Sequence, residues 1–339
     1  MSVMFPMRAK WVVVVLCLAV TGGTAAAQDT VTLAKNAAFS SFSLQPDENG
    51  SETVVEKTQI TTIEEGPASP FSFDITYYLY SDYVFRGINF SEYPGEGREK
   101  PNHQMTTDIS VDLGMLFGQE PGTCGTFTFG TFFEWYAMQK KIDPEKGGHN
   151  LQEVDYVLSW AYDIEPIATT FTLGYTFYAF PNAKSINTQE WWFSLEHNDA
   201  WMWAWLFPNN EDGVLNPSFF FAQDVEAADG GCWMEFGISH DFELVENFTL
   251  TPGMVLAVDH RWMEPIMDAG DGATQLAYIQ YGLNAAYNLA PVLQLPDWMG
   301  DVTLSGFLYF NQALGNLEDN GRIQDEFFGG MSLGWSFGG

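Results

Sequence analysis

Residues 71–80 read FSFDITYYLY, and they indicate a β-strand because apolar and polar side chains alternate along them with a period of two. Successive side chains of a β-strand point to opposite faces. One face therefore carries Phe71, Phe73, Ile75, Tyr77 and Leu79, and the other carries Ser72, Asp74, Thr76, Tyr78 and Tyr80. An apolar face opposite a more polar face is typical of a strand that lies between lipid and the interior of a barrel.

The same alternation recurs along the rest of the chain. It returns near residues 105–116, 127–136, 153–162, 169–180, 189–197, 217–225, 232–242, 248–260, 275–289, 302–311 and 326–337. With the first segment this makes about twelve strands, an even number, as single-chain bacterial barrels have. We therefore predict an all-β fold for residues 71–339, a transmembrane antiparallel up-and-down β-barrel.

The lengths of the links fit this topology if the chain enters the barrel from the periplasm. Long polar links, expected to be external loops, lie at 81–104, 137–152, 261–274 and 312–325, and brief links lie at 163–168 and 243–247. The link 198–216 is long where a short turn is expected, and it contains the aromatic run 201–207. Two interpretations stay open: the sixth strand continues, or a short aromatic segment lies on the inner leaflet.

The first 27 residues have the features of a secretory signal peptide. Arg8 and Lys10 precede an apolar run at 11–20, and small residues at 25–27 provide a cleavage site. The run is too short for a membrane-spanning helix, which needs about 20 apolar residues. A lipid anchor at Cys17 is disfavoured because bulky residues precede it. We expect 28–70 to be a flexible acidic periplasmic extension, with a short plug or strand around 54–63 as the alternative.

Composition excludes some classes of protein. The net charge is −31, from 13 basic and 44 acidic residues, which argues against nucleic acid as a partner. The 12 Trp, 14 Tyr and 28 Phe exceed the needs of one soluble core and suit aromatic belts at two membrane interfaces. A soluble β-sandwich is the rival fold. Cys124 and Cys232 are predicted at opposite ends of the barrel, too far apart to form a disulfide.

Residues 81–89, SDYVFRGIN, resemble the SDYVFRGIS element of the TorF-type porin family of bacterial outer-membrane proteins. Residues 215–218, LNPS, and 235–240, EFGISH, resemble paired strands in the second half of that family. The ending 331–337, MSLGWSF, resembles the C-terminal strand that barrel-assembly machinery recognises. The resemblance implies a porin-like protein of the bacterial outer membrane and brings no catalytic residues.

The carboxylates are the candidate site. Alternation places these residues on the lumen face: Asp74, Asp108, Asp112, Glu134, Asp155, Glu190, Glu196, Asp224, Glu235, Asp241 and Asp259. No Lys or Arg falls on that face, so the lumen is expected to attract cations. At the mouth, Arg86 lies near Asp82 and Tyr83 and beside Gly87. We expect it to form an ion pair that fixes the first external loop, and the alternative is that it shapes a constriction.

No catalytic or cofactor motif accompanies these residues. None of the histidines His103, His149, His197, His240 and His260 has a His-x-Ser spacing, and the chain lacks a G-x-S-x-G elbow and an H-E-x-x-H helix. We expect a channel for passive diffusion of small hydrophilic solutes that prefers cations, not an enzyme, without cofactor or bound metal. One alternative is a barrel that transports nothing, and whose external loops, such as 268–272, bind Ca²⁺ or Mg²⁺ or adhere to a partner. The other alternative is a barrel hydrolase.

Overall fold

The computed structural model describes residues 69–92, 101–136, 151–207, 213–263, 274–296, 299–319, 321 and 323–338. The predicted signal peptide and nearly all of the predicted extension therefore lie outside the described residues, as do His149 and the loop 268–272.

Twelve long antiparallel strands close into a ring. They are β1 (Phe71–Tyr80), β4 (Asn102–Asp112), β5 (Thr126–Tyr136), β6 (Leu151–Ile164), β7 (Thr169–Ala179), β8 (Thr188–His197), β9 (Ser218–Asp224), β10 (Cys232–Ser239), β12 (Phe248–His260), β13 (Thr274–Asn288), β14 (Asp301–Ala313) and β15 (Glu326–Gly338). Each pairs with its neighbours in chain order, β1 pairs with β15, and β10 pairs with β12 past the short β11 (Phe242–Val245), which extends β10. The predicted barrel is confirmed, and closure of the sheet rules out the sandwich.

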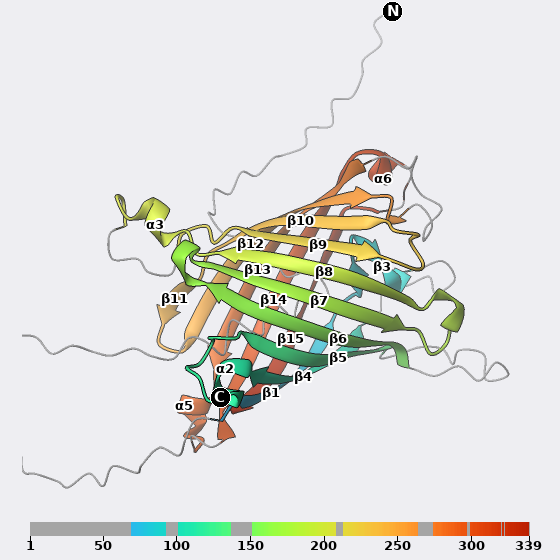
Figure 1. The fold of residues 1–339 in the computed structure, drawn as a ribbon. Coiled ribbons are helices and arrows are strands. Elements are labelled where there is room, and N and C mark those ends of the chain that lie inside the picture. Colours follow the sequence, from blue (N-terminus) through green and yellow to red (C-terminus); the bar gives the residue numbers. More distant parts are fainter. Residues whose placement is uncertain are drawn as a thin grey trace, which may run out of the picture.

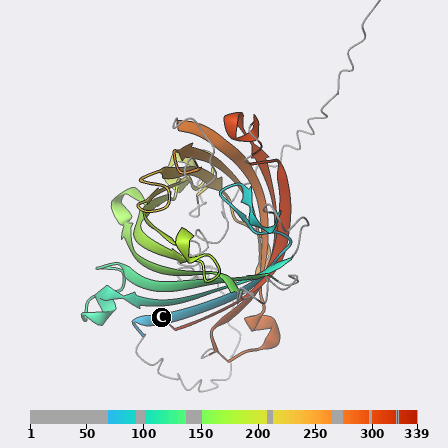
Figure 2. The same ribbon diagram turned by 90° about the vertical axis from the view of Figure 1, so that its right-hand side faces the viewer.

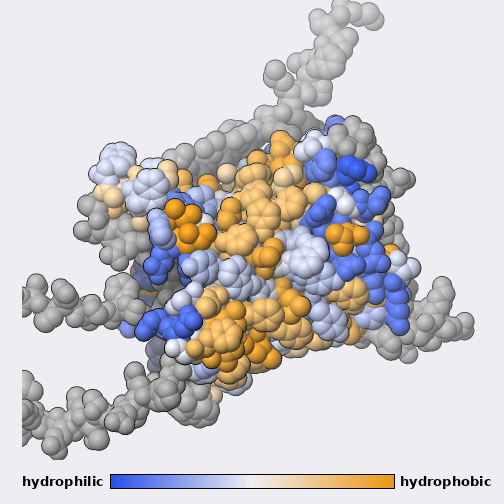
Figure 3. Space-filling view, viewed as in Figure 1, coloured by the Kyte–Doolittle hydropathy of each residue, from blue (hydrophilic) through white to orange (hydrophobic). Residues whose placement is uncertain are grey.

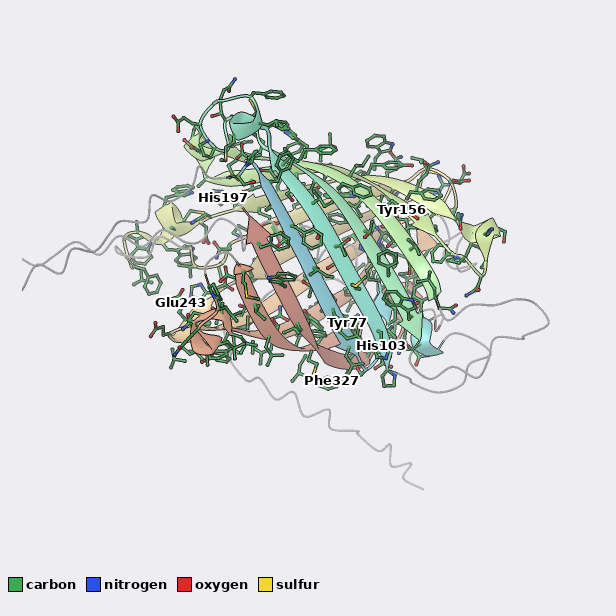
Figure 4. All side chains as sticks on the ribbon, turned by 90° about the horizontal axis from the view of Figure 1, so that it is seen from below. Tyr77, His103, Tyr156, His197, Glu243 and Phe327 are labelled. Carbon is green, nitrogen blue, oxygen red and sulfur yellow. The ribbon has the colours of Figure 1, made fainter. Side chains whose placement is uncertain are left out.

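Alternation sorts the side chains as predicted. Large apolar side chains of the outward face are exposed, among them Phe71, Ile109, Phe129, Leu173, Trp191, Leu283, Leu308 and Leu333. Figure 3 shows an apolar zone over the strands on one face of the barrel, with hydrophilic residues gathered beyond it on the right, and Figure 4 shows Tyr156 and Phe327 on the outer surface. A surface this apolar suits lipid, because monomeric soluble proteins rarely expose patches above a few hundred Å².

The two ends of the barrel differ. β1 ends at what we call the loop end, which carries β2 (Val84–Phe85), β3 (Ile88–Asn89), η1 (Phe90–Glu92), η4 (Lys184–Ile186) and α6 (Gly315–Asp319). The other end, which we call the terminal end because β1 begins and β15 finishes there, carries α2 (Leu113–Leu116), η3 (Glu165–Ile167), α3 (Ala200–Trp203) and α5 (Ala290–Leu293). In Figure 1 the loop end lies on the right and the terminal end on the left.

The two described cysteines lie at opposite ends, as predicted. Cys124 precedes β5 at the terminal end, Cys232 begins β10 at the loop end, and both are free thiols.

The aromatic link after β8 corrects one interpretation. The strand stops at His197, and the short helix α3 follows, so the view that the sixth strand continues is wrong. Asp199 organises the segment, because its carboxylate accepts the backbone N–H groups of Val214 and Leu215 at 2.6 and 3.1 Å and the indole N–H of Trp203 at 2.8 Å. Exposed side chains follow, including Trp201 and Trp205.

None of the helices in the described ranges is long and apolar enough to cross a membrane.

Candidate functional site

The loop after β1 turns back into the barrel. We call residues 81–92 the inserted loop; it contains β2, β3 and η1, and Figure 2, which looks at the loop end, shows it within the ring of strands. Arg86 and Gly87 form the tip of its hairpin, with φ of 52° and 80°. Positive φ at both central residues is what a two-residue type I′ hairpin requires.

Gly87 is needed for space as well as for backbone conformation. A Cβ at this position would lie 2.8 Å from Cδ1 of Tyr278 and 3.3 Å from Cγ2 of Ile323. The tip of the hairpin is therefore pressed against β13 and the loop before β15.

Arg86 anchors the inserted loop to the wall of the barrel. Its Nη1 and Nη2 donate to Oε1 and Oε2 of Glu190 on β8, at 2.6 and 2.8 Å. The guanidinium also lies 4.4 Å from the ring centre of Trp262 and 5.5 Å from that of Trp233. Burial alone would lower the pKa of Arg86, but the Glu190 carboxylate outweighs it and raises that pKa above its usual value.

The carboxylate of Glu190 is fully engaged by this arrangement. Besides Arg86 it accepts the hydroxyl of Tyr178 at 2.9 Å and the indole N–H of Trp262 at 2.8 Å. Breaking a buried ion pair by removing one partner costs about 3–5 kcal/mol. The ion pair therefore holds the inserted loop in place, as predicted from the sequence. The partner of Arg86, Glu190, comes from a strand that is distant in the chain.

Apolar packing surrounds the ion pair. The buried side chains that pack together here include Ile88 from the loop and Trp192, Phe220, Trp233, Trp262, Tyr278, Leu317 and Ile323 from the barrel and its loops, with Phe85 and Phe90 against them. The loop-end half of the interior is thus largely filled.

The inserted loop also contacts β5 and β6. The Tyr83 hydroxyl donates to Oε2 of Glu153 on β6 at 2.6 Å, and its ring packs near Phe132 of β5. The backbone N–H of Tyr83 donates to Oγ of Ser91 at 2.7 Å, which closes the loop on itself. Asp82, the fourth residue of the predicted mouth motif, is buried.

Arg86 adds a charge that the strand pattern does not show. As predicted, none of the described strands carries Lys or Arg on its inward face. The inserted loop nevertheless brings Arg86 into the interior, where it is 3% exposed. It is the one basic side chain among the buried residues of the described ranges.

Most of the predicted lumen carboxylates are enclosed by the barrel. Buried ones are Asp74, Asp108, Glu134, Asp155, Glu190, Asp224, Glu235 and Asp259, whereas Asp112 and Glu196 are half-buried near the terminal end. Asp241 lies in the break between β10 and β11 and is exposed, so its predicted inward position is wrong. The prediction missed Glu153, although it lies two positions from Asp155 and is therefore on the same face of β6.

Three of these carboxylates stabilise turns. Asp112 accepts the backbone N–H of Met115, Asp224 that of Ala228, and Asp259 that of Trp262, each within 2.9 Å. Capping bonds of this kind give them a structural role that alternation alone does not reveal.

Glu235 also has partners. It accepts the indole N–H of Trp233 at 2.7 Å and the hydroxyl of Tyr278 at 3.3 Å.

A second group of inward polar side chains includes several atoms that have no such partner. We call the polar wall the buried polar residues on the inward face of β4, β5 and β6 in the loop-end half, which are Asn102, Gln104, Thr106, Asp108, Glu134, Glu153 and Asp155. All are buried, yet no hydrogen bond within the described ranges reaches either amide atom of Asn102 and Gln104, or Oε1 of Glu134. Leaving a buried polar group without a partner costs about 1–3 kcal/mol. The polar wall is therefore suited to contact water or a polar solute.

The terminal-end half of the interior is different again. Its inward positions carry small residues, which include Thr128, Ser159, Thr170, Ser218, Thr249, Asn284, Ser305 and Ser336, and these are partly exposed. Solvent thus reaches the interior from this end, up to the level at which the inserted loop packs.

The described residues include no group of three His, Cys, Asp or Glu arranged to hold a metal ion. The described histidines make isolated contacts: His103 with the Tyr77 hydroxyl, beside which it lies in Figure 4, and His197 with Thr169 and Trp201.

No family model matches the chain, and no curated protein matches it. Among solved structures, the chain is similar to the KdgM porin, with TM-score 0.37 and 10% identity over 79% of this chain and 99% of that one. An outer membrane channel from Pseudomonas putida F1 gives TM-score 0.41 and 9% identity over 82% and 98%. Outer membrane phospholipase A from Escherichia coli gives 0.36 and 12% over 78% and 89%. At such values the barrel fold of this chain rests on its own strand pairing, and membership of the TorF-type family stays a prediction.

Proposed function

We propose that the protein is a channel of the bacterial outer membrane, through which small hydrophilic solutes diffuse passively, with a preference for cations. In this proposal the terminal end faces the periplasm, the apolar outer surface contacts lipid, and barrel-assembly machinery inserts the chain after a signal peptide is removed. No enzymatic activity is part of the proposal.

The observation that carries it is the charge of the interior. The strands hold nine buried carboxylates, namely Asp74, Asp108, Glu134, Glu153, Asp155, Glu190, Asp224, Glu235 and Asp259, and Arg86 is the buried base among the described residues. Charged side chains of one sign in a narrow passage favour ions of the other sign. At about 0.15 M salt the screening length is about 8 Å, so wall charges still act on ions near them.

The inserted loop sets the width of the passage in this proposal. It fills much of the loop-end half, and the terminal-end half is reached by solvent. We expect a low conductance that rises when the loop is displaced.

One observation favours a second candidate, a barrel that transports nothing. The ion pair between Arg86 and Glu190 and the packing of Trp233 and Tyr278 would also suit a permanently closed, structural barrel.

Conductance in planar bilayers separates the two candidates. Purified protein should give discrete conductance steps in KCl. Heat-modifiable, folded protein that inserts into the bilayer but carries no current, with or without Glu190→Gln, would favour the structural barrel.

A further inference from the structure

The loop-end interior has two unlike walls. In the ring order, β10, β12 and β13 lie opposite β4, β5 and β6. The first group contributes Trp233, Ala257 and Tyr278 to the packing around the inserted loop. The second group forms the polar wall.

The unmet hydrogen bonds gather on the polar wall. They involve both amide atoms of Asn102 and Gln104, Oγ1 of Thr106, Oε1 of Glu134 and Oδ1 of Asp155. On the opposite strands the amides have one bond each: Gln280 donates to Asn311 at 2.8 Å and Gln275 donates to Asp259 at 3.2 Å, while the Oε1 atoms of these two residues have no partner within the described ranges. Buried polar atoms in folded proteins normally have partners, from protein or from ordered water.

The groups of the polar wall form a continuous series. Asn102, Gln104, Thr106 and Asp108 are successive inward positions of β4, and they run from the loop end toward the middle of the barrel. Six residues of strand span about 20 Å. Gln104 pairs in register with Glu134, and Glu134 pairs with Glu153, which sets carboxylates beside the series.

The residue of the series nearest the terminal end, Asp108, adjoins the half of the interior that solvent reaches. Asp108 pairs in register with Asp74 of β1, and the next inward residue of β4, Ser110, is partly exposed. The series therefore connects the loop end to the region of small polar side chains.

We propose that the polar wall is the route by which water and small monovalent cations pass the inserted loop. The amide, hydroxyl and carboxylate oxygens of this wall would replace part of the hydration shell of the ion, and the wall that holds Arg86 and the aromatic side chains would stay dry. This rests on the proposed channel function and names where in the barrel the solute moves.

Cysteine accessibility tests the route directly. The background is a variant with serine in place of Cys17, Cys124 and Cys232, and the probe is the cationic thiol reagent trimethylammonium-ethyl methanethiosulfonate. Gln104→Cys places the thiol two residues from the loop end of β4, and Ala222→Cys is the matched control two residues from the loop end of β9, in the aromatic packing. Heat modifiability of both variants confirms that each one is folded.

We expect the thiol at position 104 to react at least tenfold faster than the thiol at position 222, measured by the mass of the adduct, and the K⁺ current to fall as it reacts. Faster labelling at position 222, or no labelling at either position in a conducting barrel, would overturn the route and leave the channel function standing. Labelling at position 104 in a barrel that carries no current would keep a water-filled polar wall and overturn the channel function.

Discussion

The guanidinium of Arg86 and the carboxylate of Glu190 meet inside the barrel through two hydrogen bonds of 2.6 and 2.8 Å, although the two residues are 104 positions apart in the chain. This pair joins the tip of the inserted loop to β8. Both side chains are almost completely buried, so neither can exchange its partner for water.

Removing the charge of Glu190 should release the inserted loop. Glu190→Gln removes the carboxylate that forms two hydrogen bonds with the buried Arg86, and breaking a buried ion pair in this way costs about 3–5 kcal/mol. Trypsin should then cut after Arg86 in the folded barrel and yield a fragment that begins at Gly87, and the conductance should rise. Glu196→Gln, on the same strand and face but near the terminal end, is the control. An Arg86 that stays resistant to trypsin in Glu190→Gln would show that packing, and not the ion pair, holds the loop.

Replacing Gly87 with alanine should loosen the loop by a steric route. The added Cβ would lie 2.8 Å from the Tyr278 ring, and φ at this position is +80°. Gly118→Ala is a matched control, because Gly118 has φ +72° and nothing within 4 Å of the added Cβ. We expect trypsin to reach Arg86 in Gly87→Ala and not in Gly118→Ala. Equal protection in both variants would mean that the hairpin tip has room to shift.

How far the sequence predicts this molecule depends on the range of the interactions. The strands could be predicted because each one shows its two faces locally, as in residues 71–80. The entry of Arg86 into the interior could not, since its partner Glu190 is on a strand four hairpin links away and no local pattern connects them. The SDYVFRGIN stretch did hold one usable signal, because Arg-Gly between Val-Phe and Ile-Asn fits a two-residue hairpin.

The roles of the carboxylates were predictable only in part. Parity correctly placed Glu134 and Asp155 inward, because strand geometry fixes which face a residue occupies. The alternation of side chains along a strand does not show whether a carboxylate at the end of the strand accepts hydrogen bonds from the neighbouring loop, as Asp224 and Asp259 do.

Acid should weaken the segment organised by Asp199. Burial would raise the pKa of Asp199, but the hydrogen bonds from Val214, Trp203, Leu215 and Asn216 outweigh it and hold that pKa below the ordinary value of 3.8. The stabilisation is therefore complete above the ordinary pKa and is lost as the pH falls through the lowered one. The indole N–H resonance of Trp203, assigned by Trp203→Phe, should change only at such acid pH. In Asp199→Asn this transition should be absent, and a transition near neutral pH in the wild type would show that Asp199 does not control the segment.

The aromatic residues after α3 should lie at the membrane interface. Trp205 is the most exposed of them, at 78%, and tryptophan favours the level of the lipid headgroups. A bimane dye on Trp205→Cys, in the variant with serine in place of the native cysteines, should emit at shorter wavelength in liposomes than the same dye on Glu120→Cys, which is in an exposed turn of the same end. Equal emission from the two positions would show that the segment extends into water.

Cation preference can be measured as the zero-current potential of the reconstituted protein in a KCl gradient. A cation-preferring channel gives a potential of the sign set by K⁺, and the preference should weaken at high salt, where wall charges are screened. Asp108→Asn, Glu134→Gln and Asp155→Asn together should reduce the preference, while glutamine in place of the three exposed residues Glu120, Glu165 and Glu243 should change it little. A potential of the sign set by Cl⁻, or a K⁺ preference that the change in the polar wall leaves unaltered, would show that the inward carboxylates do not select cations.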